Sequence, residues 1–299
     1  MTFLQHIARR FPATDIEQAF DIQTPIFDAY STGKIYALRF QLRPVDRQPR
    51  DYLGASALGG ACLRKTWANW HNLSNFGGGT LRLFRTGDIY EVRMRDELRA
   101  IGLEVTGDQS GFEAFDGQVK GHTDGFVRVD GSPWALLECK TANHRRTTEL
   151  RKFLRETPTE ALHRWSSTYN TQAHLYMAAF GVTECLYMVT DKNTDTVVAF
   201  VLQLDSEVVA AAKTEARTLL EARTPPGRGY TRPQTPQCTR FCDHAGWCWF
   251  GEPMPRACGT CTQWRNGRCA LSGNLADAVC SSYELVDYNP DAPASEWQL

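Results

Sequence analysis

Residues 121–142 read GHTDGFVRVDGSPWALLECKTA. Apolar and polar residues alternate in two runs separated by a short turn sequence, which predicts two antiparallel strands joined as a hairpin. Glu138 and Lys140 are two positions apart in the second strand, so their side chains point to the same face. A three-residue turn at 130–132 would place Asp124 directly opposite Glu138 on that face, whereas a register shifted by one residue would separate them. The hairpin is therefore predicted to present two carboxylates and one amine together.

This combination of side chains suits chemistry at a divalent metal ion. Carboxylate oxygens are ligands that Mg²⁺ and Mn²⁺ prefer. A bound ion neutralises charge on a phosphodiester and makes bound water more acidic, and a neighbouring lysine can orient that water or help to deprotonate it. We therefore expect Asp124 and Glu138 to bind the metal and Lys140 to assist the attacking water. The plain alternative is that Glu138 and Lys140 form a salt pair on an exposed strand.

The remaining sequence predicts an α/β fold, with a central mixed sheet flanked by helices. Helical patterns cover about 61–73, 81–102, 160–180 and 206–222, and strand patterns cover 186–191 and 196–204. In the second of these helices, an apolar side is expected from Leu83, Ile89, Tyr90, Met94 and Leu98. We expect three parts, a helical and irregular segment at 1–50, a core at 51–250 and a small cysteine-rich tail at 251–299.

Composition indicates a soluble globular protein in the cytoplasm. The chain has 299 residues, of which 42% are hydrophobic and 22% charged. No apolar run approaches the roughly 18 to 20 residues that cross a bilayer, and the N-terminus lacks the apolar stretch of a signal peptide. The net charge of −1 gives no overall attraction to nucleic acid, but basic residues gather at 140–164. That cluster is either a DNA-binding surface or an ordinary solvated helix face.

Eight of the ten cysteines fall into two groups with ligand-like spacing, which indicates metal binding in a compartment where disulfides are rare. Cys139 and Cys185 lie in apolar strands and are predicted core residues. In the tail, a C-x2-C pair is followed by two separated cysteines, a pattern typical of structural zinc, with disulfides as the alternative. The predicted zinc ligands are Cys258, Cys261, Cys269 and Cys280.

Several motifs together resemble those of a known family. GHTDG followed by LLECKTA is similar to the core of the PD-(D/E)xK nuclease superfamily, in the branch containing RecB-type nuclease domains, Cas4 proteins and phage recombination exonucleases. Gln172 and Tyr176 match the Q-x-x-x-Y of that branch, and Gly87 and Glu91 match its G-x-x-x-E. The resemblance covers about 52–250. It implies a restriction-endonuclease-like core and a metal-dependent DNA nuclease.

The resemblance also implies roles for individual residues. Glu91 would be a third metal ligand, with Asp88 and Asp96 as nearby rivals, and the backbone carbonyl of Cys139 would be a fourth. Gln172 and Tyr176 would position the DNA and Lys140. The catalytic set expected from this is Glu91, Asp124, Glu138, Lys140, Gln172 and Tyr176. The expected phosphate contacts are Arg64, Arg145, Arg146 and Lys152.

An iron–sulfur cluster is implied as well. In Cas4-type and AddB-type members, one upstream cysteine and three near the end of the domain hold a 4Fe-4S cluster, and Cys62, Cys238, Cys242 and Cys248 fit that layout. Three residues separate Cys238 from Cys242 where two are usual, so zinc stays a rival for this site. His244 or Asp243 could replace a cysteine in either group.

The function expected from the sequence is a DNA exonuclease of phage-type or prophage recombination or repair, using Mg²⁺ or Mn²⁺, with a single-strand annealing protein as a possible partner. One alternative is a Cas4-like nuclease that processes DNA for CRISPR adaptation. Another is a non-catalytic DNA-binding scaffold held together by its metals. The sequence leaves open the polarity of cleavage, endonuclease against exonuclease action, and the oligomeric state.

Overall fold

The computed structural model describes residues 50–74, 78–129, 131–273 and 280–288. The chain divides into two compact units, one made of 1–48 with 75–88 and one of 49–74 with 89–299. Of the smaller unit, the described part is the beginning of helix α4 (Gly78–Ala100). The predicted segment 1–50 lies outside the described residues, Arg50 excepted. The fold and the site below belong to the larger unit.

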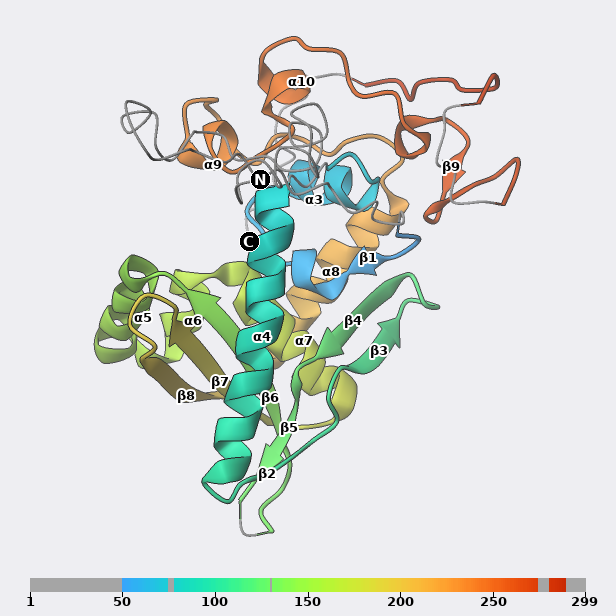
Figure 1. Cartoon of the computed structure of the whole chain (residues 1–299). Coiled ribbons are helices and arrows are strands. Elements are labelled where there is room, and N and C mark those ends of the chain that lie inside the picture. The colour runs from blue at the N-terminus through green and yellow to red at the C-terminus, as the bar shows by residue number, and fades with distance from the viewer. Residues whose placement is uncertain (1–49, 75–77, 130, 274–279, 289–299) are drawn as a thin grey trace, which may run out of the picture. The chain divides into compact units, whose positions relative to one another are not determined.

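The larger unit is built around a five-stranded mixed sheet in the order β2-β5-β6-β7-β8 (Figure 1). Its strands are β2 (Glu104–Thr106), β5 (Gly125–Arg128), β6 (Ala135–Ala142), β7 (Glu184–Asp191) and β8 (Val197–Gln203). The β6–β7 pair is parallel, and the other three pairs are antiparallel. Together with the helices described below, this confirms the α/β class and the central mixed sheet.

The predicted hairpin has the predicted register. Gly125 pairs with Leu137 and Val127 with Ala135, and the same register continued by one residue sets Asp124 opposite Glu138. At the turn, the Ser132 amide donates to the Val129 carbonyl oxygen over 2.8 Å. The spacing of the turn residues therefore fixed the alignment of the two strands correctly.

One detail of the hairpin differs from the prediction, because Asp124 lies at a bend between strands and not within one. The chain before it is β4 (Val119–Thr123), which belongs to a separate three-stranded sheet with β1 (Leu53–Gly54) and β3 (Ser110–Ala114). Gly125 makes the change of sheet possible, since its φ is 146° and a Cβ there would lie 2.8 Å from the Thr106 carbonyl oxygen.

Helices cover both faces of the central sheet. Side chains alternate along β6, so Leu136 packs in the main core with Ala173 and Met177 of α7 (Ser167–Phe180), while Leu137 faces the other way. On that second face Leu137 and Cys139 pack against Met94 and Leu98 of α4. Met94 and Leu98 are buried as expected, but Ile89 is 60% exposed, so the predicted apolar side of this helix is only partly used.

The other elements pack around this centre. The predicted helix at 160–180 is two helices, because Ser166 ends α6 (Ala161–Trp165) and its side chain then caps α7 by accepting from the Tyr169 amide. The remaining helices are η2 (Ala55–Ala57), α3 (Leu63–Trp70), α5 (His144–Glu156), η3 (Pro158–Glu160), α8 (Ser206–Glu221), α9 (Pro236–Thr239), α10 (Ala245–Trp249) and η4 (Cys258–Thr260). Near the C-terminus, β9 (Trp264–Arg265) and β10 (Arg268–Cys269) form a short hairpin.

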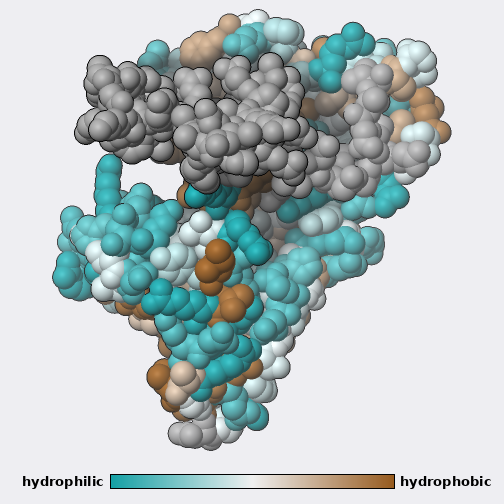
Figure 2. Space-filling model, in the orientation of Figure 1, coloured by the Kyte–Doolittle hydropathy of each residue, from teal (hydrophilic) through white to brown (hydrophobic). Residues whose placement is uncertain are grey.

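The surface of the described residues is mostly hydrophilic on the face seen in Figure 2, and hydrophobic side chains show there in small separate groups. Within the described part of the chain, none of the helices combines the length and the apolar character needed to span a bilayer.

Candidate active site

Asp124 is held against the strand that carries the other candidate residues. The β5–β6 pairing stops at Leu137, and no described strand pairs with the next part of that edge of β6. The Asp124 carboxylate occupies this edge, because its Oδ2 accepts the Cys139 backbone N–H over 2.7 Å. Since the N–H and C=O of one strand residue point to the same side, the Cys139 carbonyl lies on the Asp124 side of β6.

Glu138 and Lys140 complete the predicted trio. The Lys140 ammonium donates to Glu138 Oε2 over 2.8 Å and lies 3.7 Å from Asp124 Oδ2, so one cation sits between two carboxylates. Glu138 is only 1% exposed, and its Oε1 is buried without a hydrogen-bond partner among the described residues. The alternative of a salt pair on an exposed strand is therefore wrong, because this pair is inside the protein.

The buried position and the neighbouring charges shift the pKa values of Glu138 and Lys140. Burial raises the pKa of Glu138, and the negative charge of Asp124 adds to this, while Lys140 opposes it. Burial by itself would lower the pKa of Lys140, but the charges of Glu138 and Asp124 outweigh it and raise that pKa well above its usual value. Lys140 is therefore a stable ammonium, and Glu138 takes up a proton more readily than an exposed carboxylate.

Glu91 approaches the trio from α4. Its side chain is 16% exposed and accepts from Arg95 Nη1 over 2.5 Å and from Gln109 Nε2 over 2.8 Å. Burial raises the pKa of Glu91, and the charge of Asp124 raises it further, so the two carboxylates interact. Arg95 also donates to the Asp124 carbonyl oxygen over 3.1 Å, which ties the helix to the bend.

The two rivals of Glu91 stand in different surroundings. Asp96 is exposed and pairs with Arg99 over 3.0 Å. Asp88 belongs to the smaller unit, where its exposed carboxylate lies 3.9 Å from Arg85. Of the three acids, Glu91 is thus the one with a described interaction with Asp124.

Gln172 and Tyr176 are buried on one face of α7. The Gln172 side-chain amide donates to the Tyr176 hydroxyl over 3.2 Å. Burial raises the pKa of Tyr176 to about 12, and the charge of Glu138 contributes to the shift, which places this hydroxyl near the trio. Gly121 makes room for it, because a Cβ at that position would lie 2.5 Å from the Tyr176 oxygen.

The basic residues after β6 differ in the exposure and the contacts of their side chains. Arg145 is exposed, and Lys152 is exposed with its ammonium 3.9 Å from Glu156. Arg146 is held by Glu149 and by the Trp165 carbonyl oxygen, and its guanidinium stacks over the Trp165 ring. These side chains lie on α5, which directly follows the strand of Glu138 and Lys140.

Arg64 has a different place from the one predicted for it. It is 1% exposed, and its guanidinium donates to the Pro226 carbonyl oxygen over 2.7 Å and to Cys248 Sγ over 3.5 Å. A side chain buried in this way cannot contact a phosphate on the surface. The prediction of a phosphate contact at Arg64 is therefore wrong, because α3 turns this residue into the core beside a cysteine.

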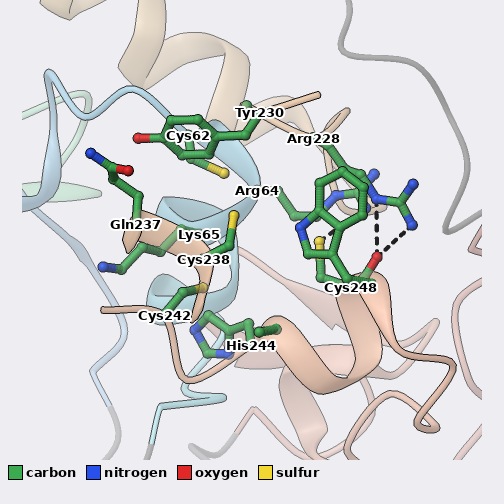
Figure 3. A pocket seen from close by; sticks show the side chains of 13 residues that line it. Cys62, Arg64, Lys65, Arg228, Tyr230, Gln237, Cys238, Cys242, His244 and Cys248 are labelled. Atoms are coloured by element: carbon green, nitrogen blue, oxygen red, sulfur yellow. Dashed lines mark hydrogen bonds between the residues drawn. The ribbon is translucent and has the colours of Figure 1, made fainter. Parts of the chain in front are cut away.

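The first cysteine group lines one pocket, shown in Figure 3. Cys62 precedes α3, Cys238 lies on α9, Cys242 follows that helix, and Cys248 lies on α10. The thiols of Cys62 and Cys238 act on the pKa of Cys242, which burial raises in the first place, so these three lie close together. The fold thus brings Cys62 to three cysteines that lie far from it in the sequence.

His244 also lines this pocket. Its Nε2 is 2.9 Å from Asn69 Oδ1, and burial lowers its pKa to about 4, so the ring is neutral near pH 7.

The second cysteine group lines a pocket of its own near the C-terminus. Cys258 begins η4 and Cys261 follows it, Cys269 ends β10, and Cys280 follows the undescribed stretch 274–279. Hydrogen bonds from Ser272 and from the Leu271 amide lower the pKa of the Cys269 thiol, as suits a thiolate ligand. The four predicted zinc ligands are therefore neighbours.

A metal ion at either kind of site would have to be bound by side chains of the described residues. Among them, no three His, Cys, Asp or Glu side chains already stand in the arrangement of a metal site. Instead, the Glu138 carboxylate pairs with Lys140, and the Glu91 carboxylate pairs with Arg95. The donors nevertheless fit a hard divalent cation, because they are carboxylate oxygens and because Glu138 Oε1 is buried without a hydrogen-bond partner among the described residues.

Several residues at the site were not predicted from the sequence. Arg95 and Gln109 bind Glu91, the ring of Tyr169 lies 5.6 Å from the Lys140 ammonium, and Tyr187 pairs in register with Glu138. Of these residues, Arg95 could have been predicted from the sequence, because a residue four positions after Glu91 on a helix lies beside it.

No family model matches the chain, and neither does any curated protein. Among solved structures, an alkaline exonuclease from Laribacter hongkongensis matches with a TM-score of 0.42 at 16% identity, over 57% of this chain and 87% of that one.

Two further matches are of the same kind. The same exonuclease in complex with dAMP gives a TM-score of 0.38 at 16% identity, over 57% of this chain and 86% of that one. A phage-related exonuclease from Haemophilus somnus 129PT gives 0.38 at 12% identity, over 52% and 77%. The structural neighbours are thus alkaline and phage-related exonucleases at low identity. The chemistry proposed below rests on the geometry of the site.

Proposed function

We propose that this chain is a divalent-metal-dependent deoxyribonuclease that acts as an exonuclease. The observation that carries the proposal is the buried trio, in which the Lys140 ammonium lies 2.8 Å from Glu138 Oε2 and 3.7 Å from Asp124 Oδ2. Burying three charged groups is costly unless they are paired, and such groups gather where a protein does chemistry. The sequence resemblance supports the choice of DNA and of exonuclease action.

The proposed metal ligands are Asp124, Glu138, Glu91 and the Cys139 carbonyl. Mg²⁺ or Mn²⁺ held there would neutralise charge on the phosphodiester and lower the pKa of the attacking water. The described structure supports the set because Asp124 and Cys139 share a hydrogen bond of 2.7 Å and because Glu138 Oε1 is buried without a partner.

Lys140 acts as a cation in this proposal. Because the neighbouring carboxylates hold its pKa well above the usual value, its ammonium donates hydrogen bonds and does not take a proton. It would orient the attacking water and stabilise the negative charge that develops at the phosphorus. Gln172 and Tyr176 would hold the DNA strand and Lys140 in position, supported by their hydrogen bond beside Glu138.

The DNA backbone would be bound by the α5 side chains Arg145, Arg146 and Lys152. Arg145 and Lys152 are exposed and available to phosphates, while Arg146 would contribute from its place against Trp165. The phage or prophage recombination role, the annealing protein as partner and the cytoplasmic location stay predictions.

The cysteine groups are proposed to be structural. Cys62, Cys238, Cys242 and Cys248 would hold a 4Fe-4S cluster, with zinc as the rival, and the tail cysteines would hold zinc. The shared pocket of each group supports this. The metals would join segments that local sequence cannot bring together, and they would supply stability that a small tail with few apolar residues lacks. The division of the chain into 1–50, 51–250 and 251–299 is part of this proposal, because the two metal sites would close the core and the tail separately.

The test is a digestion assay with the full chain on linear duplex DNA and Mg²⁺ or Mn²⁺. Glu138→Ala and Lys140→Ala should each lose at least a hundredfold in rate. The matched control is the exposed pair Glu113 and Lys120, whose ammonium and carboxylate are 2.7 Å apart, as close as those of the buried pair. Glu113→Ala and Lys120→Ala should cut like the wild type.

The substrates decide the finer points of the proposal. Substrates labelled at the 5′ or 3′ end report polarity, and covalently closed circular DNA should stay intact if the enzyme needs an end. Undiminished cutting by Glu138→Ala and Lys140→Ala would refute the catalytic assignment, and cutting of closed circles would refute exonuclease action.

A further inference from the structure

Tyr187 is a buried polar residue beside the trio to which the mechanism above gives no role. It lies on β7 in parallel register with Glu138 of β6, so the two side chains project from neighbouring strands on one face of the sheet. Tyr187 is fully buried, and its hydroxyl has no hydrogen-bond partner among the described residues. A buried hydroxyl left without a partner destabilises the folded protein.

Glu138 carries a buried acceptor oxygen that could receive a hydrogen bond from such a donor. Lys140 occupies its Oε2, whereas Oε1 is buried without a partner. The Tyr187 hydroxyl is also within electrostatic range of the trio, since burial raises its pKa well above the usual value, Lys140 opposes the shift and Glu138 adds to it. A donor and an acceptor, neither with a partner among the described residues, therefore belong to side chains that share one register position and one face of the sheet.

The ring of Tyr187 is fixed in place. It stacks on Phe200 of β8 with a centroid distance of 5.4 Å and an interplanar angle of 28°. Both residues lie on paired strands inside the main core, so the hydroxyl has little freedom to turn toward another partner.

We infer that Tyr187 is a positioning residue for Glu138. The Tyr187 hydroxyl donates through one ordered water to one lone pair of Glu138 Oε1, which leaves the other lone pair for the metal and sets the orientation of the carboxylate. A buried water with several polar partners is a regular part of protein interiors, and it would satisfy both atoms at once. Groups that orient a metal ligand in this way change metal affinity about 10- to 100-fold when they are removed. The inference rests on the proposed metal site and adds a residue to it.

The test is Tyr187→Phe, which deletes the hydroxyl and keeps the ring on Phe200. Mn²⁺ binding to the full chain without DNA is measured by electron paramagnetic resonance, together with thermal unfolding without divalent metal. The expected results are about tenfold weaker Mn²⁺ binding and an unfolding temperature close to that of the wild type. Tyr52→Phe is the control, because it deletes a hydroxyl from a ring that lies beside Arg50 and Lys120, away from the trio.

The outcomes separate this inference from the proposed function. Unchanged Mn²⁺ affinity in Tyr187→Phe overturns the inference, and so does an unfolding temperature several degrees lower, since the hydroxyl would then be structural. In both cases the nuclease proposal stands if the wild type cuts DNA and Glu138→Ala does not. If the wild type binds Mn²⁺ at this site but cuts no DNA, the proposed function is overturned. The Mn²⁺ affinity of Tyr187→Phe then still decides whether Tyr187 positions Glu138.

Discussion

Glu215 makes the stability of this protein depend on pH. It lies on α8, and its Oε2 accepts the Gly59 backbone N–H over 2.8 Å, which anchors the segment just before Cys62. Its Oε1 is buried without a partner among the described residues. Burial raises the pKa of Glu215 from 4.5 to about 7, against the opposing effect of the Gly59 hydrogen bond.

The sign of the effect follows from which state holds the proton. Between pH 4.5 and about 7 the folded protein keeps the Glu215 proton and the unfolded chain does not. The free energy of unfolding therefore falls as the pH rises through this range, and above pH 7 this group adds no further change. At 1.36 kcal/mol for each pKa unit, the full loss is about 3 kcal/mol.

The perturbation is Glu215→Gln, which keeps an oxygen for Gly59 and removes the charge. Urea unfolding of the full chain at pH 5 and pH 8 should show that the wild type loses up to about 3 kcal/mol relative to the variant over this range. Glu221→Gln, on the same helix at an exposed position, should keep the pH dependence of the wild type. The reasoning is refuted if Glu215→Gln and wild type change in parallel between the two pH values.

Three further outcomes are expected. Gly121→Ala places a Cβ 2.5 Å from the Tyr176 hydroxyl and should slow DNA cleavage at least tenfold. In the control Gly111→Ala, the new Cβ has its nearest neighbour at 3.4 Å, and this variant should cut DNA at the rate of the wild type. Equal cleavage rates for the two variants would contradict the prediction. The cleavage rate should fall as the pH drops through the raised pKa of Glu138, because protonation removes a metal ligand. A higher metal concentration should move this fall in rate to lower pH. A fall in rate that does not depend on the metal concentration would contradict the assignment of Glu138 as a ligand. Stripping the tail metal with a zinc chelator should lower the unfolding temperature, as should Cys269→Ser, and metal analysis that finds no zinc in the intact protein would exclude that site.

The hairpin shows how much local sequence can predict. The side-chain period of a strand is two residues, and the turn length expected from the sequence sets the register, so the alignment of Asp124 with Glu138 followed from the spacing of residues alone. The same local logic placed Gln172 and Tyr176 one turn apart on a helix and in hydrogen-bonding contact.

Other features depended on segments far apart in the chain. Arg64 looked like a surface cation in sequence but is buried, because Pro226 and Cys248 enclose its guanidinium from more than 160 residues away. Asp124 proved to lie at a change of sheet, which no alternation within 121–129 reveals.

The sequence by itself determined the α/β class, the register of the hairpin and the facing of its acids and amine, because these follow from spacing along one stretch of backbone. Only the tertiary structure decided that Glu138 is buried, that Arg95 ties Glu91 to the bend at Asp124, and that Tyr187 stands beside Glu138. Burial and charge pairing are properties of whatever packs around a residue, and in this chain those neighbours come from β7, α4 and α7, which the hairpin sequence does not contain.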